Sequence, residues 1–185
     1  MRLTGSSSKS EQLRDLCHIS VFAALIVICA QVSIPMPLGV PMTLQTFAIP
    51  LAGVVLGPRK GMFAVIVYVL LGAIGAPVFA GFKGGLGVLF GPTGGFILSF
   101  PLMTFLAGVC ERKGGTMWLV TGLIAGAVVN YICGMVFFVF VMPSNFTTAF
   151  TACVLPFLPT AVIKIIMVAV SGRTIKTALK KISAY

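Results

Sequence analysis

Gly81-Phe-Lys-Gly-Gly-Leu-Gly-Val-Leu-Phe-Gly-Pro-Thr-Gly-Gly95 is the stretch on which the organisation of this chain depends. Seven of its fifteen residues are glycine, and its lysine, Lys83, has no acidic neighbour in the sequence. Glycine allows positive φ angles and close backbone approach, so we expect a shaped, irregular connection between the long apolar segments on either side. Irregular backbone near membrane depth is tolerated where it is buried in protein or lines a cavity. The stretch therefore predicts a ligand-binding loop on a helical membrane protein.

The composition excludes a water-soluble domain. The 185 residues are 58% hydrophobic and 9% charged, with a mean hydropathy of +1.12, whereas soluble domains carry about 25% charged residues. The apolar segments are too long for the alternating strands of a membrane β-barrel. The expected fold class is an all-α integral membrane protein.

Six apolar segments are expected to cross the membrane as helices. They cover residues 16–34, 43–56, 61–76, 94 or 96 to 109, 117–141 and 154–171. The second segment is shorter than the roughly 20 residues of a full span. Outside this domain, which extends over 16–175, we expect a polar tail at 1–15, disordered up to Asp15, and a basic tail at 176–185. Residues 142–153 are expected to form an uncharged loop.

The distribution of charge predicts the topology. Thirteen Lys and Arg residues face only three acids, which gives a net charge of +10. With the N-terminus in the cytoplasm, eleven of the thirteen cations fall inside, as the positive-inside rule requires. Both termini are therefore expected to be cytoplasmic. Aromatic residues do not interleave with the basic ones as base-stacking platforms require, so no nucleic acid partner is expected.

Two cations, Lys83 and Lys164, do not fit this pattern. Lys164 lies inside the sixth segment, where a lysine is costly and indicates a functional site by default. The predicted spans contain no Asp or Glu to pair with it. We expect Lys164 to bind the carboxylate of an anionic ligand that enters from outside, with Lys83 facing the same side. The alternative is a lysine that extends to the interface or donates to backbone carbonyls.

Catalysis and ATP hydrolysis are not expected. The sequence has one histidine, His18, and no Ser-His or Cys-His arrangement that could supply a general base in the membrane. The five cysteines show no paired or CxxC spacing, which argues against a metal site. Gly85-Leu-Gly87 lacks the third glycine of GxGxxG, and no P-loop is present. If the protein transports a solute, its energy must come from another subunit.

Several stretches resemble the BioY family of biotin transporters. They are Val40-Pro-Met-Thr-Leu-Gln-Thr46, Leu51-Ala-Gly-Val-Val-Leu-Gly-Pro-Arg-Lys-Gly61, Leu70-Leu-Gly-Ala-Ile-Gly-Ala-Pro-Val-Phe-Ala-Gly81 and Gly84-Gly-Leu-Gly-Val-Leu-Phe-Gly-Pro-Thr-Gly-Gly95. In addition, Leu155-Pro-Phe-Leu-Pro-Thr-Ala-Val-Ile-Lys164 is similar to the family pattern Pro-Phe-x-Pro-Gly-Asp-x-x-Lys. Thr160 and Ala161 stand where that pattern has glycine and aspartate. The resemblance covers about residues 16 to 175.

The resemblance implies the substrate-binding S component of an energy-coupling factor (ECF) transporter, a six-helix bundle in the bacterial cytoplasmic membrane. It implies biotin as the transported ligand, no cofactor or metal, and as partners a transmembrane coupling protein and two ATP-binding cassette ATPases. Because Ala161 departs from the pattern, an S component for another small carboxylated vitamin or cofactor precursor, such as lipoate or dethiobiotin, stays open. A membrane assembly subunit that transports nothing is the more distant alternative.

The expected pocket is capped by residues 81–95 and floored by the second, fourth, fifth and sixth helices. A biotin site needs hydrogen-bonding groups for the ureido ring, an aromatic wall for the thiophane ring and a cation or backbone N–H groups for the carboxylate. The predicted substrate-binding residues are Gln45, Phe79, Lys83, Gly84, Gly85, Gly91, Thr93, Phe96, Tyr131, Phe157, Thr160 and Lys164. The predicted partner contact is the first helix at Ser20, Ala23 and Ala24, whose small side chains permit close helix packing.

Overall fold

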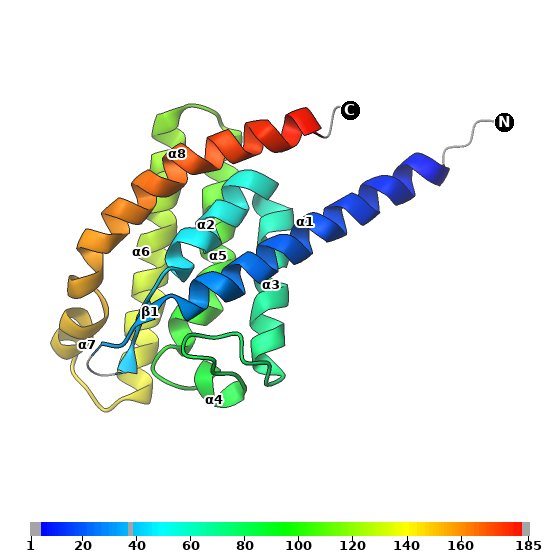
Figure 1. Ribbon diagram of the computed structural model, residues 1–185. Helices are drawn as coiled ribbons and strands as arrows, with labels where there is room; N and C mark the ends of the chain where they lie inside the picture. The colour runs from blue at the N-terminus through cyan, green and yellow to red at the C-terminus, as the bar shows by residue number, and fades with distance from the viewer. Residues whose placement is uncertain (1–4, 37–38, 183–185) are drawn as a thin grey trace.

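The computed structural model describes residues 5–36 and 39–182, and most of this part of the chain is helical (Figure 1). The helices are α1 (Gly5–Gln31), α2 (Gln45–Leu56), α3 (Pro58–Ala73), α4 (Leu86–Leu89), α5 (Gly94–Arg112), α6 (Thr116–Val141), α7 (Phe146–Cys153), the 3-10 turn η2 (Leu155–Phe157) and α8 (Leu158–Ile182). Two short strands, β1 (Ser33–Ile34) and β2 (Met42–Thr43), pair antiparallel between α1 and α2, with Ser33 opposite Thr43.

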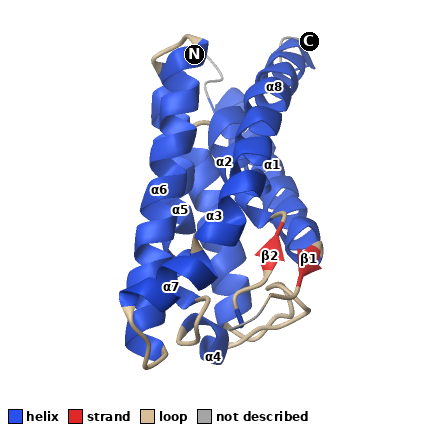
Figure 2. Cartoon of the chain, turned by 90° about the vertical axis from the view of Figure 1, so that its left-hand side faces the viewer, coloured by secondary structure: helices blue, strands red, loops and turns tan. Residues whose placement is uncertain are grey.

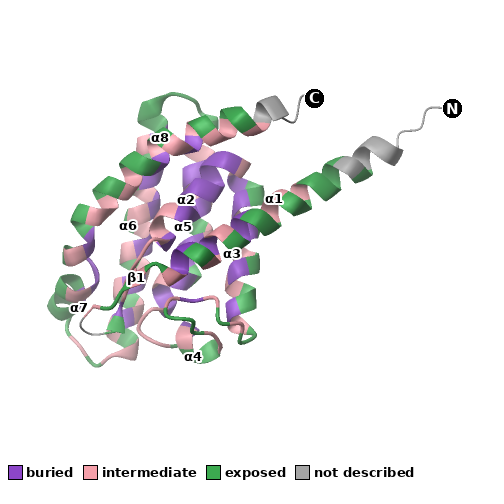
Figure 3. Cartoon of the chain, in the orientation of Figure 1, coloured by how far each residue is buried: buried purple, intermediate pink, exposed green. Residues whose placement is uncertain are grey.

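Helix α2 lies at the centre of the bundle, where Figure 3 shows it buried along most of its length. Nine of its twelve residues are buried, and α1, α3, α5 and α8 pack around it. This position explains why its sequence after Gln45 and Thr46 is apolar on every face. A Cβ at Gly53 would overlap the Thr104 carbonyl of α5, so the crossing of α2 and α5 requires glycine.

The described residues contain four stretches that are long and apolar enough to cross a membrane. They are Glu11–Gln31, Gly94–Arg112, Thr116–Val141 and Phe146–Leu179, the last of which runs through α7, η2 and α8. Large apolar side chains on the outside of these helices, such as Ile28, Ile132 and Val162, are more than half exposed, as a lipid-facing surface requires. The expectation of a helical membrane protein is therefore confirmed. Length and apolarity do not establish the expected six spans, because α2 has 12 residues and α3 has 16.

The two ends of the bundle differ in character. The N-terminal end of α1 and the C-terminal end of α8 lie together at one end, which we call the terminal end; α4, α7 and the strand pair lie at the other, the loop end (Figures 1 and 2). Ion pairs join helices at the terminal end. Asp15 of α1 pairs with Lys60 of α3 at 2.5 Å, and Glu111 of α5 pairs with Lys176 of α8 at 3.2 Å.

The expected tails are helical where the structure describes them. Helix α1 begins at Gly5, so the expected disorder up to Asp15 is wrong for residues 5–15. Asp15, at the end of this stretch, pairs with Lys60 of α3. Helix α8 continues to Ile182 because Ile175 and Leu179 pack on the core around α2.

The expected loop at 142–153 is also largely helical. Helix α7 occupies most of it, because Ala149 and Cys153, one helical turn apart, are both buried. They pack in a small core with Phe138 of α6 and Phe157 of η2. The segment has no charged residues because it packs against α6.

Candidate ligand-binding site

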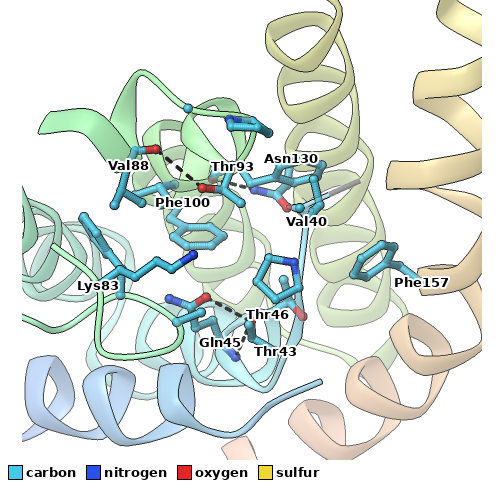
Figure 4. A pocket seen from close by; sticks show the side chains of 18 of the residues that line it. Val40, Thr43, Gln45, Thr46, Lys83, Val88, Thr93, Phe100, Asn130 and Phe157 are labelled. Atoms are coloured by element: carbon cyan, nitrogen blue, oxygen red, sulfur yellow. Dashed lines mark hydrogen bonds between the residues drawn. The ribbon is translucent and has the colours of Figure 1, made fainter. Parts of the chain in front are cut away.

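A cavity of about 240 Å³ lies at the loop end of the bundle (Figure 4). The segment before α2, the glycine-rich stretch with α4, and α5, α6 and η2 all contribute to its wall. Five aromatic side chains line it: Phe79, Phe96, Phe100, Tyr131 and Phe157. Six polar or charged side chains also line it: Thr43, Gln45, Thr46, Lys83, Thr93 and Asn130. An apolar cavity with a few convergent polar groups is the usual form of a small-molecule site.

The cavity brings together most of the residues that the sequence singled out. Those that line it are Gln45, Phe79, Lys83, Gly91, Thr93, Phe96, Tyr131 and Phe157. Gly84, Gly85, Thr160 and Lys164 do not line it. Gly84 packs so tightly on the Ala76 carbonyl that a Cβ would clash, and Thr160 Oγ1 donates a 2.9 Å hydrogen bond to the Phe157 carbonyl. Direct ligand contact by these four residues stays a prediction.

The buried amide of Gln45 is held from two sides. Its Nε2 donates to the hydroxyl of Tyr68, and its Oε1 accepts a 2.9 Å hydrogen bond from Thr43 Oγ1. Gln45 is 5% exposed and Tyr68 is fully buried, so this chain of hydrogen bonds is shielded from competing water. These hydrogen bonds fix the orientation of the Gln45 amide in the cavity wall.

Phe79 forms a second fixed part of the wall. Its ring packs edge-to-face on Tyr68, with 5.6 Å between the ring centroids, and it is 1% exposed. A Cβ at Gly72 of α3 would overlap this ring. The absence of a side chain at Gly72 therefore provides the space in which Phe79 lies.

Lys83 supplies positive charge to the cavity. In Figure 4 its ammonium group extends toward Gln45 and Phe100. The three acids of the chain, Glu11, Asp15 and Glu111, do not line the cavity. The cavity wall is therefore suited to an anionic or neutral ligand.

Lys164 lies beneath the cavity floor. Its Nζ donates hydrogen bonds of 2.7 Å to the Thr43 carbonyl and 3.0 Å to Thr46 Oγ1, and both threonines line the cavity. Of the two interpretations of this lysine, the hydrogen bond to a backbone carbonyl is the one found in the structure. A smaller cavity of about 20 Å³ beside Lys164 is also lined by Ala161.

Asn130 is a site residue that the sequence analysis missed. It lies in the middle of α6, is 1% exposed and lines the cavity. Its Nδ2 donates to the Phe96 carbonyl at 2.9 Å and to Ser99 Oγ at 2.8 Å. An asparagine inside an otherwise apolar span is the signal that could have found it. The segment at Val40 and Pro41, which also lines the cavity, carries no comparable polar signal.

The predicted partner-contact residues on α1 differ in exposure. Ser20 and Ala24 are exposed on the same face of α1. Ala23, however, is 5% exposed and belongs to the core, because it lies on the face of α1 that packs on α2 and α3. Ala23 therefore offers little surface to a partner in this conformation, and a partner contact there stays a prediction.

The fold and the cavity define a helical membrane protein with a small-molecule site at one end of its bundle. The family model named BioY matches residues 4–181 of the chain. The protein therefore belongs to the BioY family, as the sequence motifs predicted.

Relatives and a solved structure agree with this assignment. The chain is 35% identical to the biotin transporter BioY2 of Lactococcus lactis, over 96% of this chain and 98% of that protein. It is 46% identical to the biotin transporter BioY of Thermotoga maritima, over 66% of this chain and 73% of that protein. Its fold is similar to the crystal structure of the S-component for biotin from an ECF-type ABC transporter, with a TM-score of 0.84 and 26% identity over 91% of this chain and 93% of that one.

Proposed function

We propose that this protein is the S component for biotin of an ECF transporter, which captures biotin at the loop end and supports its ATP-driven uptake. The observation that carries the proposal is the cavity, where an aromatic wall, two oriented buried amides and one lysine meet. Its relatives' role in biotin transport supports the choice of ligand. A transport role also accounts for a chain whose sequence contains no P-loop and no candidate general base.

The three parts of the cavity wall match the three parts of biotin. The carbonyl oxygen of Asn130, the second N–H of Gln45 and the hydroxyl hydrogen of Thr46 are left to exchange hydrogen bonds with the ureido ring. In this arrangement the phenylalanines enclose the thiophane ring, and the ammonium group of Lys83 binds the carboxylate. Binding of the carboxylate by Lys164 stays a second proposal, and it requires the lysine to leave Thr43 and Thr46.

We further propose that α1, α2, α3, α5, α6 and α8 are the six membrane helices, with both termini in the cytoplasm. The terminal end carries basic residues from α3, α5 and α8, namely Arg59, Lys60, Arg112, Arg173 and Lys176. This charge supports a cytoplasmic terminal end by the positive-inside rule. The cavity at the loop end would then receive its ligand from outside.

The proposed partners are a transmembrane coupling protein and two ATP-binding cassette ATPases. We place the coupling contact on the exposed face of α1 at Ser20 and Ala24, where small side chains permit close approach. Ala24→Trp should abolish biotin uptake in cells that hold the ATPase module, while the purified variant still binds biotin. Ile132→Trp on the exposed face of α6 is the matched control and should leave uptake unchanged. Normal uptake by Ala24→Trp would contradict this contact.

The decisive experiment for the ligand is calorimetric titration of the purified protein with biotin, dethiobiotin and lipoate. Gly87 lines the cavity, and a Cβ added there meets nothing within 4 Å. A side chain at Gly87 therefore meets no clash at its Cβ, and we expect Gly87→Phe to obstruct the cavity and abolish binding without unfolding the protein. Leu86→Phe, at the exposed neighbouring position outside the cavity, should bind like the wild type.

The outcomes separate the candidate functions. Biotin binding that Gly87→Phe abolishes supports the proposal. Tight binding of lipoate or dethiobiotin instead of biotin would favour the alternative S component. Binding of none of the three ligands would favour an assembly subunit.

A further inference from the structure

Gln31, the last residue of α1, makes a set of hydrogen bonds that the proposed binding mode does not use. Its Oε1 accepts a 2.9 Å hydrogen bond from the backbone N–H of Phe82. Its Nε2 lies 3.3 Å from each of three backbone carbonyl oxygens, those of Val27, Val78 and Phe79. The oxygen and the nitrogen of the Gln31 side-chain amide therefore both bind the backbone of residues 78–82, the segment that leads into the glycine-rich stretch.

This segment is a tight turn that needs outside support. Phe79 and Lys83 exchange backbone hydrogen bonds of 2.9 and 3.3 Å across it. Between them, Phe82 has a φ of +56°, a conformation that is unfavourable for a residue with a side chain. The Phe82 ring is 73% exposed, so packing of its side chain does not hold the backbone in place. The hydrogen bond from Phe82 N–H to Gln31 instead joins this backbone to α1.

The turn bounds the cavity on one side. Phe79 at its start and Lys83 at its end both line the cavity. The chain that follows Gln31 pairs with another wall: the Val32 carbonyl accepts a hydrogen bond from Leu44 N–H at 3.0 Å, and Ser33 pairs with Thr43, which lines the cavity. The C-terminal end of α1 thus joins two walls that are far apart in the sequence.

We propose that Gln31 is a positioning residue that holds the turn of residues 79–83 against α1 and thereby sets the rate at which the ligand leaves the cavity. The inference takes biotin as the ligand and therefore rests on the proposed function. Without the side-chain amide, the turn loses its connection to α1, and Phe79 and Lys83 leave their places in the wall more often. Escape through this wall then becomes faster, although no side chain that lines the cavity has been replaced.

The test compares dissociation of radiolabelled biotin from the purified wild type, Gln31→Leu, Gln31→Glu and Gln12→Leu. Gln31→Leu keeps the volume of the side chain and loses every hydrogen bond, so biotin should dissociate about tenfold faster or more. Gln31→Glu keeps an acceptor for Phe82 N–H but places its second oxygen against three carbonyl oxygens, so it should also release biotin faster than the wild type. Gln12→Leu changes an exposed glutamine near the other end of α1 and should match the wild type.

A second measurement needs no ligand. Hydrogen exchange of the Phe82 amide in the ligand-free protein should be faster in Gln31→Leu than in the wild type, and exchange in α6 should be unchanged. If the wild type binds no biotin, the proposed function fails, and the exchange experiment still tests the contact. If the wild type binds biotin and Gln31→Leu releases it at the same rate, the inference is wrong. An equal effect of Gln12→Leu would also overturn it.

Discussion

Lys164 of α8 donates a 2.7 Å hydrogen bond to the backbone carbonyl of Thr43, a residue 121 positions earlier in the chain. The same ammonium group donates to Thr46 Oγ1 at 3.0 Å. Helix α8 is thereby joined to the start of α2 directly beneath the cavity. The lysine supports the floor of the proposed binding site through two residues that line it.

Replacement of Lys164 by methionine tests this support. The variant keeps most of the side-chain volume and loses both hydrogen bonds, so we expect a loss of about 1–3 kcal/mol in stability. Thermal unfolding of the purified protein in detergent measures this loss. If Lys164 acts through the floor, binding of biotin and of biotin amide should weaken equally. A loss confined to biotin would show instead that Lys164 binds the carboxylate directly.

Lys83 is expected to make the protein prefer biotin, which carries a carboxylate, over biotin amide, which does not. Its ammonium group extends into the cavity, and a hydrogen bond between ionised groups contributes about 1.5–3 kcal/mol. Lys83→Met should therefore weaken biotin binding by about tenfold or more and leave biotin amide binding nearly unchanged. Lys83→Arg, which keeps the charge, should retain a preference for the acid. Titration of each variant with both ligands measures the difference, and an equal loss for both would remove Lys83 from the carboxylate site.

Tyr68→Phe tests the oriented amide of Gln45. The substitution removes one hydroxyl from a fully buried ring and leaves the Nε2 of Gln45 without its acceptor. We expect a loss of about 1–3 kcal/mol in stability, since a buried donor is left unpaired. Biotin affinity should also fall severalfold, because the amide can then rotate. Unchanged unfolding and unchanged affinity would mean that Gln45 is fixed by Thr43 alone.

The sequence could predict the class of protein and much of the site because the relevant signals are local. The length of the apolar segments predicts membrane helices. Gln45 lies within a stretch that resembles the family, and Lys83 lies between two such stretches. The roles of Lys164 and Gln31 could not be read in this way. Each role depends on a contact between segments far apart in the chain, 121 residues for Lys164 with Thr43 and 51 for Gln31 with Phe82. No spacing rule within one helix predicts such contacts.

The helical tails and α7 were missed for a related reason. The polar composition of residues 1–15 suggested a disordered N-terminal tail, and residues 142–153 were expected to form an uncharged loop. Ile175 and Leu179 of α8 are half-buried against the core around α2, and Ala149 of α7 is fully buried. Tertiary packing, rather than local composition, extends α8 and forms α7. Asn130 differs from these cases, since its polarity within α6 was visible in the sequence.

Gly72→Ala tests whether the position of Phe79 matters for binding. A methyl group at Gly72 would overlap the Phe79 ring, and this ring is confined by its contact with Tyr68 and by the backbone bridge to Lys83. Overpacking of this kind costs about 1–3 kcal/mol, so both thermal stability and biotin affinity should decrease. The double variant Gly72→Ala/Phe79→Leu removes the overlap and should recover stability. Because it also removes an aromatic ring from the cavity wall, its biotin affinity should stay low. Recovery of both properties would mean that the ring itself contributes nothing to the ligand site.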